Sequence, residues 1–432
     1  MAGRVIGESV ERVVADSCPG VLRPHLAADG ALARLRTPGG ALPVATLRGL
    51  RAVSAELADG SLGLTSRGNT QVRGVSPENV AALETRLAAL GMLPHPTHER
   101  VRNIVASPLS GRTQASMVDV DQLAFALDTA LCARPDLVAL PGRFLMGLDD
   151  GTGDIAGEEP DVLAIAGAGG RFTVAPAGVA AGVEVTREEV VGAVLAMATA
   201  FLVERQRQES KAWRVKELPG GAAAILNALA SDGYETASAS WGPQTIPAPG
   251  LHEQRDGGYA LCAVVPLGIL NGEQIEALAA CCDLATPGPV LSGPVLSGSA
   301  LDGGTPLRIT PWRRVVVRDL EEPAALAARE LLAAVGLVVE PHAAWARVTA
   351  CAGRPGCAKS LTDVQADARA FAAACAPDGV AVHWAGCERG CGATHGGVAL
   401  LAAEGGYRVI GGLSDTDRAR AASSSIGLTA SD

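Results

Sequence analysis

The chain has 432 residues, 48% of them hydrophobic and 19% charged, and its net charge at neutral pH is −10. This length exceeds what one hydrophobic core supports, so we expect two to four domains. The acidic balance argues against nucleic acid or an anionic membrane as partner, because both need a basic face. No apolar stretch reaches the roughly 18 residues of a membrane-spanning helix, and we expect a cytoplasmic protein.

Two segments far apart in the chain share one layout. Residues 31–56 and 259–283 each predict a strand, a Gly-containing turn and a helix. Each is followed by a β-rich run that a short polar loop interrupts, at residues 62–75 and 307–320. Such a repeat indicates a duplicated domain whose halves pair about a pseudo-two-fold axis. Trp312 of the second copy then falls opposite Arg67 of the first, either as a replacement for a ligand-facing group or as a core side chain.

The remaining segments carry the periodicities of helices and of a buried strand. Apolar residues recur at three- and four-residue spacing over 119–132, 187–208 and 321–336, which predicts helices. Residues 161–169 form a continuous apolar run that predicts a strand. Helices and strands therefore mix along the whole chain.

Four of the ten cysteines are spaced as metal ligands. Cys351 and Cys357 form Cys-x5-Cys, and Cys387 and Cys391 form Cys-x3-Cys, both in Gly-rich loops. Soft thiolates suit iron bound to sulfide, and glycine lets the backbone wrap closely around a cluster. A zinc site is the alternative, although zinc usually spaces paired cysteines by two to four residues. The other six are expected to be buried free thiols: Cys18, Cys132, Cys262, Cys281, Cys282 and Cys375.

Arginines of this acidic chain gather in short motif-like loops. Arg67 and Arg73 lie in TSRGNTQVRG, Arg102 in VRNIVASP and Arg143 in LPGRF. Planar guanidinium groups pair well with carboxylates, and a ligand with several acidic arms needs donors from several segments. Taken singly, each arginine is more often a solvated surface charge. Together they predict a site for a ligand that carries several carboxylates.

The cysteine spacing, TSRGNTQ, RNIVASP and LPGRF together resemble the nitrite and sulfite reductase family, which includes sirohaem-dependent reductases and precorrin-3B synthases. The resemblance covers most of the chain. It implies an α+β fold with duplicated ferredoxin-like half-domains that pair about a pseudo-two-fold axis, plus two α/β domains. The expected boundaries are 1–92 and 241–320 for the half-domains, and 93–240 and 321–432 for the α/β domains, the last carrying the cysteines.

The resemblance also implies cofactor and ligand contacts. The four cysteines would bind a 4Fe-4S cluster, and Cys391 would be the residue that bridges to sirohaem in a reductase. Arg67, Arg102 and Arg143 would hold carboxylates of the macrocycle. The same motifs add further candidate binding residues: Asn69, Gln71, Arg73 and Asn103.

Within the family, the chain looks most like the precorrin-3B synthases. It opens with CPGVLRP (residues 18–24), and Leu145 stands where reductases tend to place a second basic residue after the one matching Arg143. The sequence CERGCGATHGG also differs from the motif that the reductases have after their third cysteine. The implied reaction is the oxygen-dependent hydroxylation of precorrin-3A at the meso carbon between rings A and D, with γ-lactone formation, in aerobic cobalamin biosynthesis.

The implied partners are precorrin-3A, dioxygen and an electron donor, and the family also uses a mononuclear non-haem iron. His25, His383 and His395 are the imidazoles near the site loops, although a lone histidine is more often structural. No catalytic residue is assigned. Two other functions remain open: a sirohaem-dependent sulfite or nitrite reductase, and a non-catalytic protein whose thiolates hold a structural metal.

Overall fold

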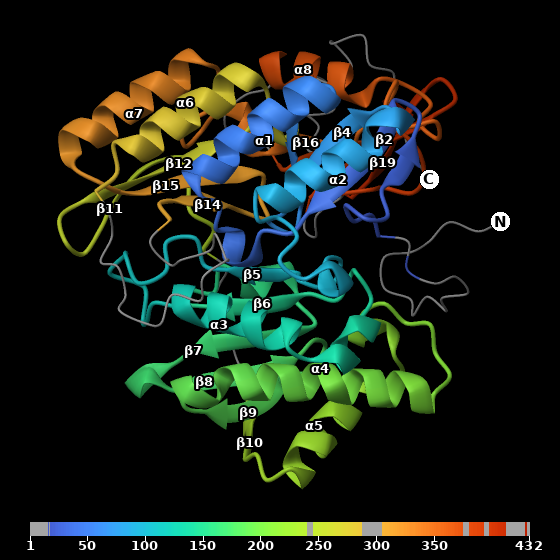
Figure 1. Cartoon of the computed structure of the whole chain (residues 1–432), viewed down its shortest axis with the longest axis vertical. Helices are drawn as coiled ribbons and strands as arrows, with labels where there is room; N and C mark the ends of the chain where they lie inside the picture. The colour runs from blue at the N-terminus through green and yellow to red at the C-terminus, as the bar shows by residue number, and fades with distance from the viewer. Residues whose placement is uncertain are drawn as a thin grey trace.

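The computed structural model describes residues 16, 18–239, 245–286, 305–374, 380–392, 397–411 and 428–429. Four sheets organise these residues, two of them antiparallel and two mixed. Figure 1 shows the two antiparallel sheets under a layer of helices in the upper half of the molecule. One mixed sheet and its helices form the lower half, and the other mixed sheet lies behind the upper layer.

The two antiparallel sheets have matching topologies. Their strand orders are β1-β2-β4-β3-β13 and β11-β12-β15-β14. The strands are β1 (His25–Ala27), β2 (Gly30–Leu35), β3 (Leu62–Leu64), β4 (Thr70–Val75), β11 (Gly250–Glu253), β12 (Tyr259–Val264), β13 (Ile269–Leu270), β14 (Leu307–Ile309) and β15 (Arg314–Leu320). The helices are α1 (Val44–Leu57), α2 (Val80–Ala89), α6 (Gly272–Asp283) and α7 (Glu322–Ala334). Strand for strand, the first four of one sheet correspond to the four of the other, which confirms the duplicated ferredoxin-like half-domains.

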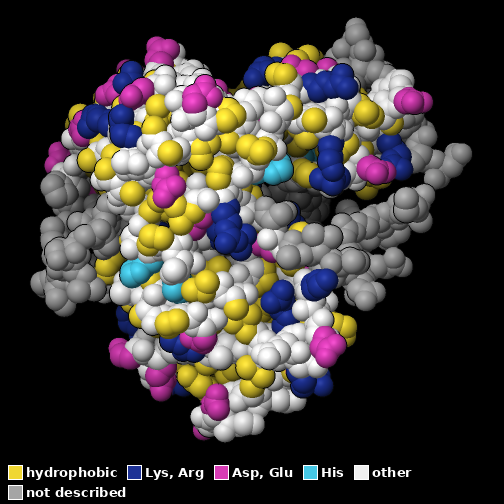
Figure 2. Space-filling model, turned by 45° about the vertical axis from the view of Figure 1, so that its right-hand side comes forward, with side chains coloured by type: hydrophobic (Ala, Val, Ile, Leu, Met, Phe, Trp, Pro, Cys, Tyr) yellow, Lys and Arg dark blue, Asp and Glu magenta, His cyan; other side chains and the backbone are white. Residues whose placement is uncertain are grey.

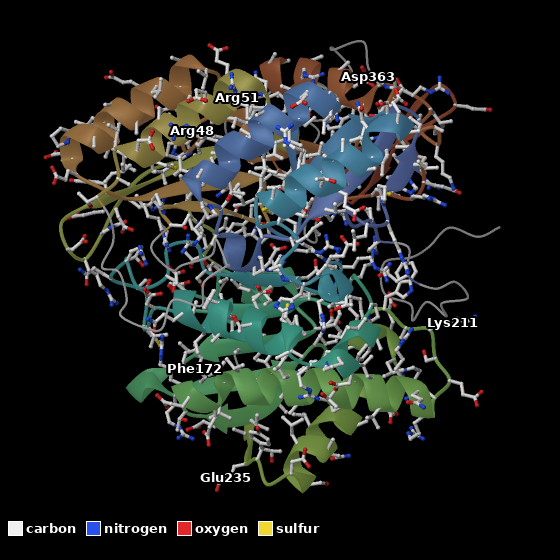
Figure 3. The ribbon with its side chains drawn as sticks, viewed as in Figure 1. Arg48, Arg51, Phe172, Lys211, Glu235 and Asp363 are labelled. Carbon is white, nitrogen blue, oxygen red and sulfur yellow. The ribbon has the colours of Figure 1, made fainter. Side chains whose placement is uncertain are left out.

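The two half-domains pack through α1 and α6. Arg48 of α1 lies 3.5 Å from Glu276 and 2.5 Å from Asp283 of α6, and Figure 3 shows Arg48 and Arg51 along this helix layer. These ion pairs are exposed and contribute little to stability. Apolar side chains from both copies, Leu47 of α1 and Leu278 of α6 among them, belong to one buried cluster. The halves therefore share a core and form one unit.

The polar loop inside each half-domain is one tight turn, used twice. Thr65 N–H donates to Asn69 O at 2.9 Å, and Thr310 N–H donates to Arg314 O at 3.0 Å. This register places Trp312 opposite Arg67, as the sequence predicted. The same register places Arg313 opposite Gly68. Both residues have a left-handed backbone, with φ of 55° and 60°, although Arg313 has a side chain.

The two mixed sheets also resemble each other. Their orders are β10-β9-β8-β7-β6-β5 and β16-β17-β18-β19-β20. In each, the first three strands along the chain are parallel neighbours and the fourth joins antiparallel. The strands are β5 (Ile104–Ala106), β6 (Met146–Asp149), β7 (Val162–Ala166), β8 (Phe172–Pro176), β9 (Ala181–Val185), β10 (Thr236–Ser238), β16 (Val348–Ala350), β17 (Val382–Ala385), β18 (Val398–Ala403), β19 (Gly406–Ile410) and β20 (Leu428–Thr429). The helices are α3 (Asp121–Cys132), α4 (Val190–Arg207), α5 (Gly221–Ser231) and α8 (Val364–Ala374).

The α+β architecture predicted from the sequence is thus confirmed, with two antiparallel half-domains and two mixed α/β sheets. Helices α3, α4 and α7 and strand β7 lie inside the segments predicted for them. The boundaries proposed after residues 92, 240 and 320 stay a prediction. Among the described residues, no helix combines the length and the apolar character that crossing a membrane requires.

Candidate functional site

The four spaced cysteines follow two neighbouring strands. Cys351 directly follows β16 and Cys357 lies in the same loop, while Cys387 and Cys391 lie in the loop after β17. Strands β16 and β17 are parallel and paired, so their carboxyl ends meet at one edge of the sheet. Residues that are 40 positions apart in the chain are therefore brought to a common edge by the topology.

The electrostatics show that the four thiols form one group. Burial raises the pKa of Cys391, and the thiols of Cys387, Cys351 and Cys357 raise it further. Among the described residues, no three of these sulfur atoms lie within 4.8 Å of one another.

The backbone around the cysteines supports the same ligands. Gly386 N–H donates to Cys351 Sγ at 3.2 Å, the kind of contact that stabilises a thiolate bound to iron. Cys357 N–H donates to Gly353 O at 2.7 Å, which closes a turn with a positive φ of 64° at Gly353. The glycines of these loops thus allow the turns that bring the sulfur atoms inward.

The histidines considered for a second iron are placed differently from one another. His383 is buried, and its Nδ1 and Nε2 lie 2.9 Å from Thr349 Oγ1 and 3.0 Å from Cys391 O. Both ring nitrogens are therefore engaged, and His383 fixes the loop of the last cysteine pair. His25 is exposed on the edge strand β1. His395 lies outside the described residues.

The part of the chain that the structure describes contains one close group of three metal-ligand side chains. Asp149 ends β6, Asp150 and Asp154 follow it, and all three are buried, with carboxylate oxygens within 4.8 Å of one another. Both oxygens of Asp149 accept backbone N–H groups, from Gly151 and Gly153 and from the next turn. This loop is therefore stabilised by its own hydrogen bonds, and we assign no iron to it.

The arginine cluster of the first half-domain consists of Arg34, Arg36 and Arg67, whose charges act on one another. Arg34, Arg36 and Arg67 each bury one guanidinium nitrogen that has no hydrogen-bond partner among the described residues. Burial, and then the charge of Arg34, lowers the pKa of Arg36 to about 9. Burial, followed by the charges of Arg214 and Arg143, lowers the pKa of Arg67 to about 10. A buried, mutually repelling set of cations with free donors needs an anionic ligand.

Basic side chains also gather on the surface. Figure 2 shows Lys and Arg side chains bordering a hollow between the upper and lower parts of the molecule. Arg143 is exposed, and its guanidinium carbon lies 5.4 Å from the ring centre of Trp213, a cation–π contact. Its charge still contributes to the electrostatics of Arg67 and Arg34. Arg67 and Arg143 therefore lie near enough for their charges to interact, and their binding of a ligand carboxylate stays a prediction.

The sequence prediction missed Arg34 and Arg36. Both stand on the same face at the end of β2, separated by the buried Leu35. Arg36 donates through Nε and Nη2 to Arg100 O, at 3.3 and 3.0 Å, which leaves Nη1 without a partner. The alternation RLR immediately before the turn PGG was the available signal, because residues two apart on a strand share a face.

Asn69 and Asn103 hold the site loops together. Asn69 accepts from Thr37 N at 3.1 Å and donates to Asn103 Oδ1 at 3.1 Å, and both amides are buried. Asn103 donates in turn to Gly142 O at 2.8 Å. Every one of these hydrogen bonds is to the protein itself. Gln71 lies half-buried on β4, with its side chain close to Gly63 of β3.

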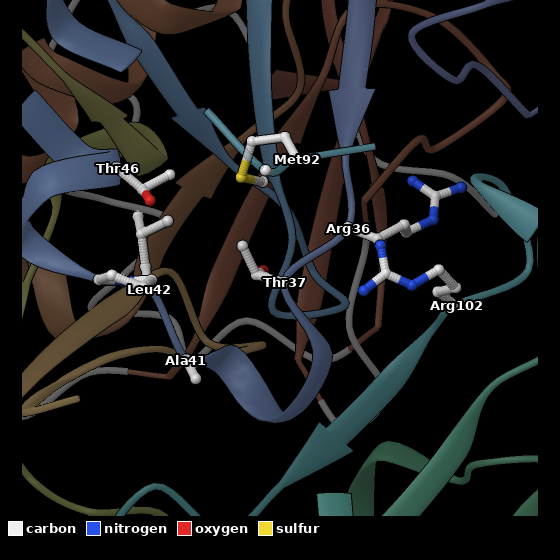
Figure 4. A pocket seen from close by; sticks show the side chains of 9 residues that line it. Arg36, Thr37, Ala41, Leu42, Thr46, Met92 and Arg102 are labelled. Carbon is white, nitrogen blue, oxygen red and sulfur yellow. The ribbon is translucent and has the colours of Figure 1, made fainter. Parts of the chain in front are cut away.

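Arg102 has a partner that the sequence analysis did not foresee. Its Nε and Nη2 donate to the two oxygens of Asp128 of α3 at 2.7 and 2.6 Å, in a buried pair. Figure 4 shows Arg102 beside Arg36 at a small pocket that Thr37, Leu42 and Met92 also line. Because two of its donor nitrogens are already bound to a carboxylate, Arg102 stabilises the fold here. Its expected contact with a ligand carboxylate stays a prediction.

Arg73 is turned toward the cysteine loop. Its guanidinium pairs with both oxygens of Asp29 and donates to Gly356 O, the residue before Cys357. Arg73 thus connects the first half-domain to the loop of the first cysteine pair. Its Nε and Nη2 donate to protein groups, and the substrate contact expected for Arg73 stays a prediction.

Trp312 packs against a small apolar cluster that contains Leu145. Leu145 is 3% exposed and belongs to this cluster with Val105. Trp312 Nε1 donates to Glu158 at 2.6 Å. Burial raises the pKa of Glu158, while Trp312 and then Arg67 act against that shift. The packing agrees with the core role considered for Trp312, and the role as a replacement for a ligand-facing group stays a prediction.

The expected buried free cysteines are found where they are described. Cys132, Cys262, Cys281 and Cys282 are free and buried. Cys18 is half-buried, and its pKa is raised by burial and by Asp16, whereas Arg34 acts in the opposite direction. Cys375 lies outside the described residues.

Comparisons with known proteins place this geometry in context. Residues 25–90 match the model of the nitrite/sulfite reductase ferredoxin-like half domain. Sulfite reductase (ferredoxin) 2 of Mycolicibacterium paratuberculosis is 30% identical over 133 residues. That match covers 31% of this chain and only 24% of the mycobacterial protein, so it speaks for one segment.

Two relatives align over most of the chain. The ferredoxin–nitrite reductase of Synechococcus elongatus is 26% identical and covers 84% of this chain and 74% of that protein. A precorrin-3B synthase of Sinorhizobium sp is 25% identical, and the alignment covers 87% of this chain and 78% of that protein. The names of these relatives are those of enzymes, which supports an enzymatic role for this chain.

A solved structure shows the same fold. The NirA protein of Mycobacterium tuberculosis superposes with a TM-score of 0.70 at 21% identity, over 88% of this chain and 73% of that one. The agreement extends well beyond the half-domain that the family model matches. Residues 25–90 therefore form a nitrite/sulfite reductase ferredoxin-like half domain, and the chain as a whole has the nitrite/sulfite reductase fold.

Proposed function

We propose that this protein is a cytoplasmic oxidoreductase that holds a 4Fe-4S cluster on its four spaced cysteines and binds a tetrapyrrole with several carboxylates. The observation that carries the proposal is the set of unpartnered, buried guanidinium nitrogens of Arg34, Arg36 and Arg67. Carboxylate arms would satisfy these donors and neutralise the charges, because guanidinium and carboxylate pair bidentately. Thiolates stay available as iron ligands in a reducing cytoplasm.

Within this class we propose precorrin-3B synthase activity. One atom of dioxygen would hydroxylate the meso carbon between rings A and D of precorrin-3A, and the ring A acetate would close a γ-lactone. The second oxygen atom would leave as water, which requires two electrons from an external donor and two protons. The iron–sulfur cluster would pass on those electrons, and a mononuclear non-haem iron is part of the proposal without assigned ligands.

The residues of this chain would bind, orient and shield the substrate. Arg34, Arg36 and Arg67 would fix carboxylate arms, and Arg143 would meet an arm at the surface. Trp312, half-buried against the apolar cluster of Leu145, would face the macrocycle's hydrocarbon surface and keep water away from it. A buried leucine in place of a second cation suits a macrocycle better than a small oxyanion. The long alignment with a precorrin-3B synthase supports the same choice.

A sirohaem-dependent reductase is the second candidate, because the nitrite reductase of Synechococcus elongatus aligns over a comparable length. In that case Arg34, Arg36 and Arg67 would hold the carboxylates of sirohaem, and Cys391 would be the bridging cysteine. Cys391 is the most exposed of the four cysteines, which leaves its sulfur open to a second group.

The two functions separate in one experiment. The protein is purified anaerobically, its iron, sulfide and zinc are measured, and it is incubated with precorrin-3A under ¹⁸O₂. We expect a broad brown absorption from the cluster and a product that carries one ¹⁸O atom by mass spectrometry. Sharp sirohaem bands with sulfite or nitrite reduction would establish the reductase instead. A colourless protein containing zinc would reject both and favour a structural metal.

A further inference from the structure

Arg313 lies close to the loop of the last cysteine pair and to Glu158. It is the second copy's counterpart of Gly68, and its φ of 55° matches the 60° of that glycine. A left-handed backbone is unfavourable for a residue with a side chain, and it persists only where the surroundings hold it.

Two glycines make room for that side chain. A Cβ atom on Gly268 would lie 2.5 Å from Cδ of Arg313, and one on Gly392 would lie 3.0 Å from its Nη2. Both glycines have positive φ values, 69° and 91°. Gly392 directly follows Cys391, so the guanidinium group reaches the loop of the last cysteine ligand.

The charge of Arg313 interacts with Cys351, Glu158 and His383. Burial lowers its pKa, while the thiol of Cys351 and then the carboxyl of Glu158 act in the opposite direction. Burial, followed by the charge of Arg313, also lowers the pKa of His383 to about 4. A guanidinium stays protonated in proteins, so a permanent cation lies near the thiol of Cys351.

On the basis of the cluster proposed above, we propose that Arg313 sets the reduction potential of that cluster. Reduction adds an electron to a group already made negative by four thiolates. A buried cation nearby stabilises the more negative form, because Coulomb interactions are weakly screened away from water. Arg313 therefore raises the potential and makes the cluster easier to reduce.

The test is a redox titration of the anaerobically purified full chain, followed by the electron paramagnetic resonance signal of the reduced cluster. Arg313→Gln should make the midpoint potential more negative by about a tenfold change in the reduction equilibrium, or about 59 mV for one electron. Arg313→Lys keeps the charge and should restore most of the wild-type value. Arg389→Gln removes an exposed cation near Cys391 and should shift the potential less, because solvent screens it.

Two further variants keep the outcome decisive. Arg329→Gln on the exposed face of α7 removes the same charge far from the cysteines and should leave the potential unchanged. Gly268→Ala keeps the charge but displaces the Arg313 side chain, so it should shift the potential in the same direction as Arg313→Gln.

An unchanged potential in Arg313→Gln, with the cluster signal intact, overturns the role of Arg313 while leaving the cluster in place. If Arg313→Gln does not assemble a cluster, Gly268→Ala decides, and an unchanged potential there overturns the role. A wild-type protein without any cluster signal overturns the proposed function and this inference together.

Discussion

Asn69 donates from Nδ2 to Asn103 Oδ1 at 3.1 Å, and this hydrogen bond joins the first half-domain to the first α/β sheet. Asn69 lies in the turn that carries Arg67, and Asn103 lies directly before β5 and contacts Gly142, next to Arg143. Three loops that the sequence marked as ligand-binding are therefore held in register by two amides. The position of the arginines depends on this pair.

Asn103→Ala should destabilise the protein by about 1 to 3 kcal/mol, because it leaves buried amide and carbonyl groups without partners. It should also weaken ligand binding, since the loops of Arg67 and Arg143 lose their common support. Asn227→Ala on the exposed side of α5 is the matched control, and it should change neither the stability nor the ligand affinity. The measurements are denaturant unfolding and tetrapyrrole titration. Stability equal to the wild type would remove the amide pair from its supporting role.

Cys391→Ser should abolish the visible absorption of the cluster, because serine is a poor ligand for iron in this setting. Cys132→Ala removes a buried thiol of α3 that belongs to no ligand group, and its absorption should match the wild type. Iron and sulfide analysis alongside the spectra checks both variants. A Cys391→Ser protein that keeps its full iron and sulfide content would show that the four thiols are not the ligands.

Arg67→Ala should lower the affinity for a polycarboxylate tetrapyrrole at least tenfold, or about 1.4 kcal/mol, because a buried guanidinium–carboxylate pair is lost. The same variant should make the ligand-free protein more stable, since it removes one of several buried cations that repel one another. Arg86→Ala on the exposed face of α2 should affect neither quantity. Titration calorimetry measures the expected loss of affinity, and thermal unfolding measures the expected gain in stability. An Arg67→Ala variant that is less stable and binds with full affinity would contradict both expectations.

The sequence predicted the elements and the cysteine group better than the partners of the arginines. Helix periodicity is local, so α3, α4 and α7 could be located, and the Cys spacing carries its own chemistry. The pair between Arg102 and Asp128, by contrast, joins a loop to a helix face 26 residues away. Arg73 donates to the carbonyl oxygen of Gly356, which lies 283 residues further along the chain. Such pairings are set by tertiary packing, and no local pattern encodes them.

Arg102→Ala is therefore expected to harm folding as well as any binding. It would leave the Asp128 carboxylate buried without a counter-charge, which costs about 3 to 5 kcal/mol. Arg102→Met combined with Asp128→Leu removes both charges and should recover most of that loss. Denaturant unfolding of the single and double variants measures the difference. A single variant as stable as the wild type would show that the ion pair contributes little and would return Arg102 to the ligand-binding set.

The stability of the protein should depend on pH through Asp154. Burial, followed by the charges of Asp149 and Asp150, raises the pKa of Asp154 well above its ordinary value. The native state then holds a proton that the unfolded chain releases near pH 3.9. The contribution of Asp154 to the free energy of unfolding is therefore fully present below that pH and is lost as the pH rises through the native pKa of Asp154.

Asp154→Asn should flatten this dependence and raise the free energy of unfolding at neutral pH, because asparagine stays neutral. Asparagine also keeps an oxygen that accepts the 2.6 Å hydrogen bond from Ser107 Oγ. Alanine has no such acceptor, so Asp154→Ala should raise the free energy of unfolding by less than Asp154→Asn. Denaturant unfolding at several pH values between 4 and 8 compares the two variants with the wild type. An Asp154→Asn protein that is less stable at pH 7 would mean that the native state needs the negative charge, and the direction argued from burial would be wrong.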